Sequence, residues 1–330
     1  MAVTSPISWQ SQIGKQRDWV WRGWQIRYTY QHAPLSENQP PFLLVHGFGA
    51  SIGHWRNNVP TLTQHRSIYA LDLLGFGASE KVSAPYEVGF WAEQLYDFWR
   101  TFIGQPVVLV GNSIGSLVCL AAATRYPEMV QSLVMLNLPD PSVLEYPQWL
   151  TAALTPIQRL TAPLQRGVFA IAQCIFLSPL VFNPFFRLIR RPRFIRFWAG
   201  QAYTTSTALT EELLDIFSRP AFDRGAAAAL RAMVGRRPSS AADYRVKTVL
   251  PHLTIPMLLI WGKQDRMVPP KLGPLIAKLN PRLTLAEIEQ AGHCPHDECP
   301  EVVNRLILEW LASQGQAEKM AESLKEGHEN

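Results

Sequence analysis

A serine between two glycines is the residue in this sequence best placed to act as a nucleophile. The segment 111–115 reads Gly-Asn-Ser-Ile-Gly, which has the spacing G-x-S-x-G, and it directly follows the apolar run 107–110. Glycines on both sides suit a tight strand-to-helix turn, which leaves no room for a Cβ and strains the serine backbone. A serine that only caps a helix is the alternative. We predict that Ser113 is the nucleophile of an acyl-transfer reaction.

A base and an orienting acid follow Ser113 further along the chain. Asp265 comes four residues after the apolar run 257–261, and His293 comes after the strand-like segment 283–288. Both residues therefore belong to loops at the carboxyl ends of expected parallel strands, on the same sheet edge as Ser113. We predict that His293 Nε2 accepts the Ser113 proton, while Asp265 accepts the His293 Nδ1–H and stabilises the imidazolium.

An acyl-transfer serine also needs hydrogen-bond donors for the oxyanion of its tetrahedral intermediate. The backbone N–H of Ile114 is one candidate, because it lies at the start of the expected helix, where the helix dipole helps. The segment His-Gly-Phe-Gly at 46–49 follows an apolar strand, and its glycines allow the backbone to turn inward. We predict the N–H of Phe48 as the second donor, the alternative being an ordinary glycine turn.

Other residues could perform parts of the same chemistry. Asp72 and Asp140 also follow expected strands, and Asp140 is the alternative orienting acid. His296 is the alternative base, whereas His46 is predicted to be structural. The segment 293–299 contains two histidines, two cysteines and two acids, but its spacing matches no standard zinc pattern. We therefore expect neither a metal nor an organic cofactor.

The elements that must position these residues are visible as short apolar runs. Runs without polar alternation are typical of strands covered on both faces. Between them lie amphipathic stretches of helix length, 88–102 and 114–126, so we predict a mainly parallel sheet with helices on both faces. The segment 19–30 is expected to form a hairpin with a turn at Arg22-Gly23. The predicted strands lie at residues 42–45, 68–71, 107–110, 133–136 and 257–261.

The spacing of these runs predicts an insertion. About 120 residues separate Leu136 from Met257, whereas a crossover between parallel strands needs only about a dozen. We predict that the first part of a core domain spans 1–138 and that a helical cap is inserted at 139–246. The second part of the core then spans 247–314, and a flexible charged tail follows at 315–330.

The chain resembles the chlorophyll dephytylase and pheophytinase branch of the α/β-hydrolase superfamily. The resemblance is carried by PFLLVHGFGASIGHWRNNVPTL, YALDLLGFGASEK, VVLVGNSIGSLVCLAAA, LLIWGKQD and AGHCPHDECPEVVNRLILEWL. It covers residues 20–138 and 255–312 and is weak through the insertion. It implies an α/β-hydrolase fold, a triad of Ser113, Asp265 and His293, hydrolysis of the phytyl ester of a chlorophyll-type pigment, and association with thylakoid membranes.

The insertion has an unusual charge pattern. Residues 146–210 contain seven arginines and neither Asp nor Glu, although the whole chain has a net charge of only +5. The uncharged run 167–186 has the length of a membrane span, but prolines interrupt it. We predict instead that the cap dips into an anionic membrane surface, rather than only covering the site. The residues predicted to face the membrane are Phe176, Phe182, Phe185, Phe186, Phe194, Trp198, Arg190, Arg191 and Arg193.

Composition limits the remaining function classes. A hydrophobic content of 47% excludes wholesale disorder, and four cysteines in 330 residues are too few for a disulfide scaffold. The basic cluster is interleaved with aliphatic residues, which disfavours nucleic-acid binding. Because the N-terminal residues lack an apolar signal-like stretch, we expect an intracellular protein that is cytoplasmic or peripherally attached to a photosynthetic membrane.

These features together predict a serine esterase for a bulky apolar ester. The expected substrate is the phytyl ester of chlorophyll or a related pigment, cleaved to chlorophyllide and phytol through an acyl-enzyme on Ser113. One alternative is a carboxylesterase or lipase for another lipid ester. Another is an inactive hydrolase-fold protein that binds a pigment or prenyl lipid, and a third is cofactor-free lyase or peroxidase-like chemistry. The sequence leaves open the oligomeric state and the choice between chlorophyll and pheophytin.

Overall fold

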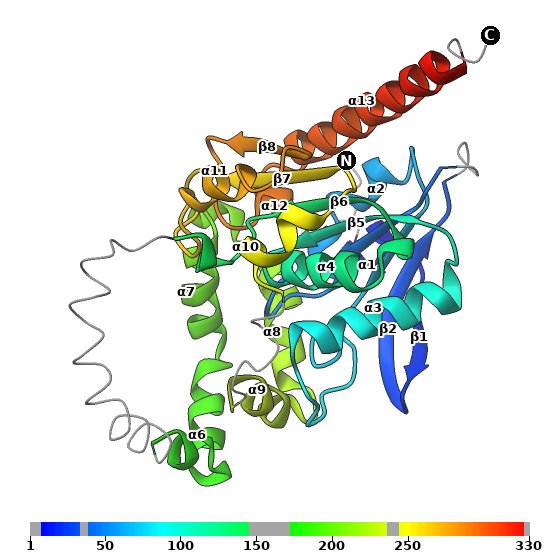
Figure 1. Cartoon of the computed structure of the whole chain (residues 1–330). Coiled ribbons are helices and arrows are strands. Elements are labelled where there is room, and N and C mark those ends of the chain that lie inside the picture. Colours follow the sequence, from blue (N-terminus) through cyan, green and yellow to red (C-terminus); the bar gives the residue numbers. More distant parts are fainter. Residues whose placement is uncertain (1–7, 34–38, 145–171, 236–243, 327–330) are drawn as a thin grey trace, which may run out of the picture.

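A sheet of eight strands forms the centre of the protein (Figure 1). The structure is a computed structural model and describes residues 8–33, 39–144, 172–235 and 244–326. The strand order is β1-β2-β4-β3-β5-β6-β7-β8, and all neighbours from β4 to β8 pair in parallel, which confirms the predicted sheet. The strands are β1 (Gln16–Trp21), β2 (Trp24–Gln31), β3 (Phe42–Val45), β4 (Ile68–Leu71), β5 (Val107–Asn112), β6 (Val130–Leu136), β7 (Met257–Gly262) and β8 (Leu283–Ile288).

The hairpin of β1 and β2 lies at one edge of the sheet, where the pairing is antiparallel. Arg22 and Gly23 form its two-residue turn, and both have positive φ angles, of 52° and 86°. Such a turn matches the right-handed twist of the two strands that it joins. The predicted hairpin is therefore confirmed, with slightly longer strands than expected.

Helices cover both faces of the sheet. Successive side chains of each central strand point to opposite faces, and because these side chains are apolar, each face needs a covering layer. In β5, Val107 and Leu109 pack into one core, whereas Val108 and Val110 pack into the other. This two-sided burial explains why the strands appear in the sequence as unbroken apolar runs. The first core lies under α3 (Val88–Phe102), α4 (Ile114–Arg125), α10 (Val246–Val249) and α11 (Leu272–Ala277), and the second lies under α2 (Val59–Leu62) and α13 (Pro300–Glu326).

Among the described residues, helices α6 to α9, which lie between β6 and β7 in the chain, stand away from the sheet (Figure 1). We call them the cap helices: α6 (Pro179–Ile189), α7 (Pro192–Ala202), α8 (Glu211–Ser218) and α9 (Ala226–Gly235). Residues 145–171 and 236–243 of the insertion, with Arg159 and Arg166, lie outside the described residues. The domain limits at 138 and 246 therefore stay a prediction.

The C-terminal helix α13 differs from the sequence-based expectation. It runs from Pro300 to Glu326 and projects beyond the body of the protein (Figure 1), whereas a flexible tail was expected from residue 315. The segment 316–325 consists of Gln, Ala, Glu, Lys, Met, Ser and Leu, mostly strong helix formers, so the helix continues from its packed first turns. Within the described ranges, no helix is both long and apolar enough to cross a bilayer.

Candidate active site

Ser113 lies in the tight turn between β5 and α4. Its φ and ψ angles are 55° and −121°, a strained conformation for a residue with a side chain. A Cβ on Gly111 would overlap the backbone of Gly115, and a Cβ on Gly115 would overlap the carbonyl oxygen of Val45 on β3. The glycines therefore let α4 begin directly against the sheet, and the turn presents Ser113 at the edge of the sheet.

His293 and Asp265 meet Ser113 at this edge, from the loops that follow β8 and β7. The Ser113 hydroxyl lies 2.8 Å from His293 Nε2, and His293 Nδ1 lies 2.8 Å from Asp265 Oδ2. Both His293 and Asp265 are buried. The structure thus brings all three predicted residues into one hydrogen-bonded chain, a geometry in which the imidazole can take the hydroxyl proton.

The Asp265 carboxylate is held in its charged form. Burial raises the pKa of Asp265. The hydrogen bond and charge of His293, together with hydrogen bonds from the Val268 N–H and the Asn137 amide, lower the pKa by more than burial raises it, so it lies below its usual value. Its Oδ1 accepts the backbone N–H groups of Met267 and Val268 at 2.8 and 2.9 Å. Oδ1 is thus fixed by the loop, while Oδ2 faces His293.

Asn137 is a member of this cluster that the sequence analysis missed. Its side-chain amide donates to Asp265 Oδ2 at 2.6 Å and to the carbonyl of Gly292 at 3.1 Å. Asn137 directly follows β6 and has a φ of 49°. A polar residue at the carboxyl end of a central strand was the available signal.

The two predicted oxyanion donors flank the serine. Gly47 packs against the turn, since a Cβ on Gly47 would lie 3.4 Å from the Ser113 Cβ. This contact places the loop that carries Phe48 beside the nucleophile. Among the described residues, no hydrogen bond uses the N–H of Phe48 or of Ile114. Both groups are therefore available to a developing negative charge, and their role stays a prediction.

A comparison with protein families decides the family of the chain. The family model described as alpha/beta hydrolase fold matches residues 40–300. The chain belongs to the alpha/beta hydrolase fold family. The predicted fold class is therefore confirmed, and strands β3 to β8, the serine turn and the two loops that carry Asp265 and His293 all fall within the matched region.

Individual relatives of this alpha/beta hydrolase share less than 30% of its residues. The chain is 28% identical to the chloroplastic pheophytinase of Arabidopsis thaliana, over 87% of this chain and 64% of that protein. It is 24% identical to the alpha/beta hydrolase domain-containing protein VTE7 of the same plant, over 84% and 76% of the two chains. The chain thus spans less than two thirds of pheophytinase.

A solved structure extends this similarity. The crystal structure of a membrane phospholipase A, described as a bacterial virulence factor, superposes with a TM-score of 0.69 at 26% identity. The similarity covers 92% of this chain and 88% of the phospholipase chain. Most of the chain therefore shares its fold with a protein described as a membrane phospholipase A.

The two alternative acids of this alpha/beta hydrolase, Asp140 and Asp72, accept hydrogen bonds from the backbone N–H groups of loops. Asp140 accepts the backbone N–H groups of Ser142 and Val246 at 2.7 and 2.6 Å, so it joins the two ends of the insertion and does not orient His293. Asp72 accepts the N–H groups of Ile52 and Ala78, each at 2.6 Å. Burial raises the pKa of Asp72 to about 6, against the effect of these donors.

The other histidines do not reach the serine. His46 is buried, with Nδ1 2.7 Å from the Gly47 carbonyl and Nε2 accepting the Leu73 N–H, which agrees with the predicted structural role. His296 was the alternative base, but its Nε2 faces His54 Nδ1 at 3.3 Å, in a buried cluster. Burial lowers the pKa of His296 and of His54 well below the usual value, so both stay neutral.

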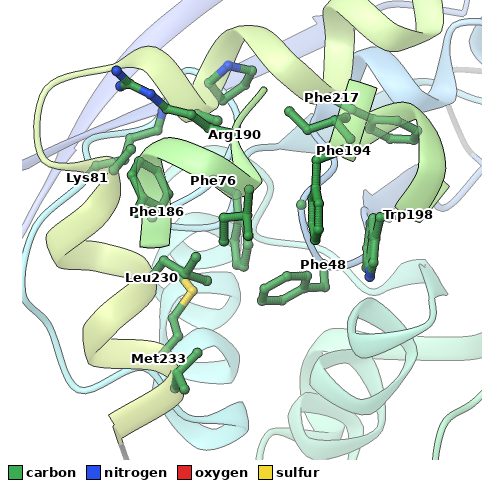
Figure 2. Close-up of a pocket in the computed structure, with 18 of the residues that line it drawn as sticks. Phe48, Phe76, Lys81, Phe186, Arg190, Phe194, Trp198, Phe217, Leu230 and Met233 are labelled. Atoms are coloured by element: carbon green, nitrogen blue, oxygen red, sulfur yellow. The ribbon is translucent and has the colours of Figure 1, made fainter. Parts of the chain in front are cut away.

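Two cavities open beside the site, and they share three aromatic residues. The catalytic cavity has a volume of about 200 Å³ and contains Ser113 and His293 in its wall. The aromatic chamber has a volume of about 420 Å³ and lies between the cap helices and the loops after β3 and β4. Phe48, Trp198 and Phe217 belong to both walls (Figure 2).

The cap residues that were predicted to face a membrane divide into two groups. Phe182 and Phe186 are 0% and 7% exposed, so their prediction is wrong. They are on the inner face of α6, where they pack with Ala226 of α9. Exposed or partly exposed are Phe176, Phe185, Phe194, Trp198, Arg190, Arg191 and Arg193. The sequence analysis also missed exposed apolar residues, namely Ile175, Leu180, Val181, Leu188 and Phe197.

Proposed function

We propose that this protein is a serine hydrolase that cleaves a carboxylic ester through an acyl-enzyme on Ser113. The observation that carries the proposal is the chain of two 2.8 Å hydrogen bonds from Ser113 through His293 to Asp265. A hydroxyl, an imidazole and a buried carboxylate in this order are the groups that nucleophilic acyl transfer requires.

The proposed reaction has two halves. In the first, Ser113 Oγ attacks the ester carbonyl while His293 Nε2 takes its proton, and the N–H groups of Phe48 and Ile114 bind the oxyanion. His293 then returns the proton to the leaving alcohol, and the acyl group stays on Ser113. In the second half, His293 takes a proton from water while the water oxygen attacks the acyl carbon. His293 then returns the proton to Ser113 Oγ as the acid leaves, which restores the free enzyme. Asp265, held by Asn137, stabilises the imidazolium in both halves.

The proposed substrate is the phytyl ester of chlorophyll or a related pigment, which would give chlorophyllide and phytol. The similarity to pheophytinase supports this choice. The apolar lining of the aromatic chamber supports it independently, because a long hydrocarbon gains most from an apolar wall. No residue of the proposed mechanism calls for a metal or an organic cofactor.

We also propose that the cap helices contact a membrane surface, such as the thylakoid. On the outer side of α6 and α7, Leu180 is 88% exposed and Phe197 is 68% exposed. Arg191 and Arg193, between and within these helices, are exposed as well. Apolar side chains beside arginines suit the boundary between lipid tails and anionic head groups. A phytyl ester partitions into that region, so this surface would bring the cap to its substrate.

The experiment that tests the proposed function uses purified protein and three kinds of ester. Chlorophyll a, pheophytin a and short p-nitrophenyl esters are each incubated with the wild type and with Ser113→Ala. Release of chlorophyllide or pheophorbide that disappears in Ser113→Ala supports a pigment esterase. Pigment that binds without any product, from the wild type as from the variant, would instead indicate an inactive binding protein.

A second candidate function is a lipase for another lipid ester. It is favoured by the similarity to the membrane phospholipase A structure at 26% identity, with a TM-score of 0.69. When phospholipid is added to that experiment as a fourth substrate, turnover of p-nitrophenyl esters and of phospholipid, with pigments left intact, would support this candidate against the pigment esterase.

A further inference from the structure

The catalytic cavity and the aromatic chamber are neighbours separated by a narrow aromatic wall. Phe48, Trp198 and Phe217 line both cavities. The rings of Phe48 and Trp198 meet edge to face, with centroids 6.3 Å apart. Phe48 comes from the loop after β3, whereas Trp198 comes from α7 and Phe217 from α8, so the core contributes one of the three shared side chains and the cap contributes two (Figure 2).

The chamber beyond this wall is lined almost entirely by apolar side chains. Phe186 from α6, Leu230 and Met233 from α9, and Phe76 from the core surround it (Figure 2). Its volume of about 420 Å³ lies in the range of small-molecule sites. A wall of this kind offers dispersion contacts and little hydrogen bonding, so it selects for hydrocarbon.

Two cations, Lys81 and Arg190, also border the chamber. The Lys81 ammonium donates to the carbonyls of Gly77 and Ser79 and pairs with Asp223 at 2.8 Å, which uses all three of its donors. The Arg190 guanidinium lies over the ring of Phe222, 4.8 Å from its centroid. The Lys81 ammonium is therefore fully engaged, the Arg190 guanidinium lies over an aromatic ring, and the other side chains that line the chamber are apolar.

We propose that the aromatic chamber holds the long hydrocarbon chain of the ester, and that the touching rings of Phe48 and Trp198 part to admit the chain. This inference rests on the proposed esterase function and specifies where its substrate lies. The Phe48 N–H is the proposed oxyanion donor, and the Phe48 ring borders the chamber. A carbonyl bound at that N–H thus has one substituent beside the entrance, and the remainder of the substrate faces the opening of the catalytic cavity.

The chamber predicts a dependence on chain length that the catalytic residues alone do not. Each methylene buried in an apolar wall increases kcat/KM up to about fourfold, until the chamber is full. Two series of esters locate the chain. In one, p-nitrophenyl esters of fatty acids lengthen the acyl side. In the other, acetates of straight alcohols and of phytol lengthen the alcohol side. A rise in one series supports the proposal and identifies the side, whereas two flat series overturn it.

Filling the chamber provides the second measurement. Leu230→Trp and Ala226→Phe each place extra volume inside it, from positions on α9. Each variant should lower the ratio of kcat/KM for a long ester to that for a short ester at least tenfold, since burial of about two methylenes is lost. Val20→Trp is the control, because Val20 is 69% exposed on the edge strand β1, outside the cap, and its substitution should leave the ratio unchanged.

A failure of the proposed pigment substrate can be distinguished from a failure of the chamber assignment. If pigments are not cleaved, but the long-to-short ratio falls in Leu230→Trp and Ala226→Phe, the chamber assignment stands and the pigment substrate is wrong. If pigments are cleaved, but folded Leu230→Trp and Ala226→Phe keep the wild-type ratio, the chamber assignment is wrong and the proposed function stands. The wild-type series remains decisive if a filled variant does not fold, which circular dichroism would reveal.

Discussion

Thr204 is fixed to Glu298 by two hydrogen bonds to a single carboxylate oxygen. The Thr204 N–H and hydroxyl donate to Glu298 Oε2 at 2.8 and 2.7 Å, while Glu298 Oε1 accepts the N–H of Gly292 at 2.8 Å. The His293 N–H in turn donates to the carbonyl of Ala202 at 2.8 Å. The segment that ends α7 is therefore joined to the loop of His293, so the position of this cap helix and that of the histidine depend on each other.

Removal of the Glu298 carboxylate should destabilise the protein. Glu298→Ala leaves three donors without their acceptor, and we expect a loss of about 2–4 kcal/mol in the free energy of unfolding. Urea denaturation followed by tryptophan fluorescence measures this loss. The matched control is Glu289→Ala, since Glu289 is 75% exposed and pairs only at the surface with Lys263, so its loss should stay below about 0.5 kcal/mol. Equal effects of the two substitutions would contradict the structural role of Glu298.

The amide of Asn137 should contribute to turnover through Asp265. Its 2.6 Å hydrogen bond to a charged oxygen corresponds to about 1.5–3 kcal/mol, so removal should lower kcat/KM roughly 10- to 150-fold. Asn137→Gly removes the side chain and tolerates the φ of 49°. Asn137→Ala also removes the amide but adds backbone strain. It should therefore be less stable than Asn137→Gly, while its kcat/KM should fall by a similar factor. Full activity in Asn137→Gly would exclude a role for the amide.

The close approach of α4 to the sheet should make Gly115 irreplaceable. Gly115→Ala forces a Cβ onto the carbonyl oxygens of Val45 and His46, which belong to the backbone and cannot move aside. We expect a loss of more than about 3 kcal/mol in stability, measured as the midpoint of thermal unfolding or as insoluble expression. Gly200→Ala is the control, since its nearest neighbour is Leu209 Cδ1 at 3.7 Å. In the interior of α7 this alanine should stabilise by about 0.5–1 kcal/mol.

Buried neutral histidines should make the fold sensitive to acid. Burial lowers the pKa of His46 from 6.5 to about 4 and lowers those of His54 and His296 in the same direction. Because the unfolded chain binds these protons first, the free energy of unfolding falls as the pH falls from about 6.5 towards 4. For His46 alone the loss is about 3 kcal/mol. Thermal midpoints measured from pH 8 to pH 4 should be constant above about pH 7 and decrease below it.

Asp72 acts in the opposite direction within the same pH window. Burial raises the pKa of Asp72 from 3.8 to about 6, so the folded state binds this proton first and gains stability as the pH falls. Asp72→Asn removes that compensation, and its thermal midpoint should decrease more steeply below pH 6 than that of the wild type. A shallower decrease in Asp72→Asn would show that the assigned direction is wrong.

The proposed membrane surface should depend on the exposed arginines of the cap. Arg191→Glu combined with Arg193→Glu should lower the fraction of protein that floats with anionic liposomes at least tenfold, because each basic residue near such a surface contributes about 1 kcal/mol. Lys278→Glu combined with Arg305→Glu changes the net charge equally, at exposed positions outside the cap, and should leave flotation unchanged. Equal recovery with anionic and neutral liposomes would contradict the proposal.

Much of the core and of the candidate site could be predicted because the signals are local. Gly111 and Gly115 are required because the strand and the helix meet there with no space for a Cβ. The five residues 111–115 alone therefore indicate the turn. Asp265 and His293 could be placed because the carboxyl ends of parallel strands share one edge of the sheet. The strands themselves were visible because two-sided burial leaves an unbroken apolar run.

Only the tertiary structure decided which way the cap residues face and which polar groups meet. The segment of α6 is apolar on most of its circumference, so its composition could not show that Phe182 and Phe186 point inward while Leu180 points outward. That choice depends on where α9 packs against α6. Asn137 likewise became part of the site only when the loops after β6, β7 and β8 converged on one carboxylate. Contacts between residues more than a hundred positions apart depend on the packing of whole elements, and no local pattern records them.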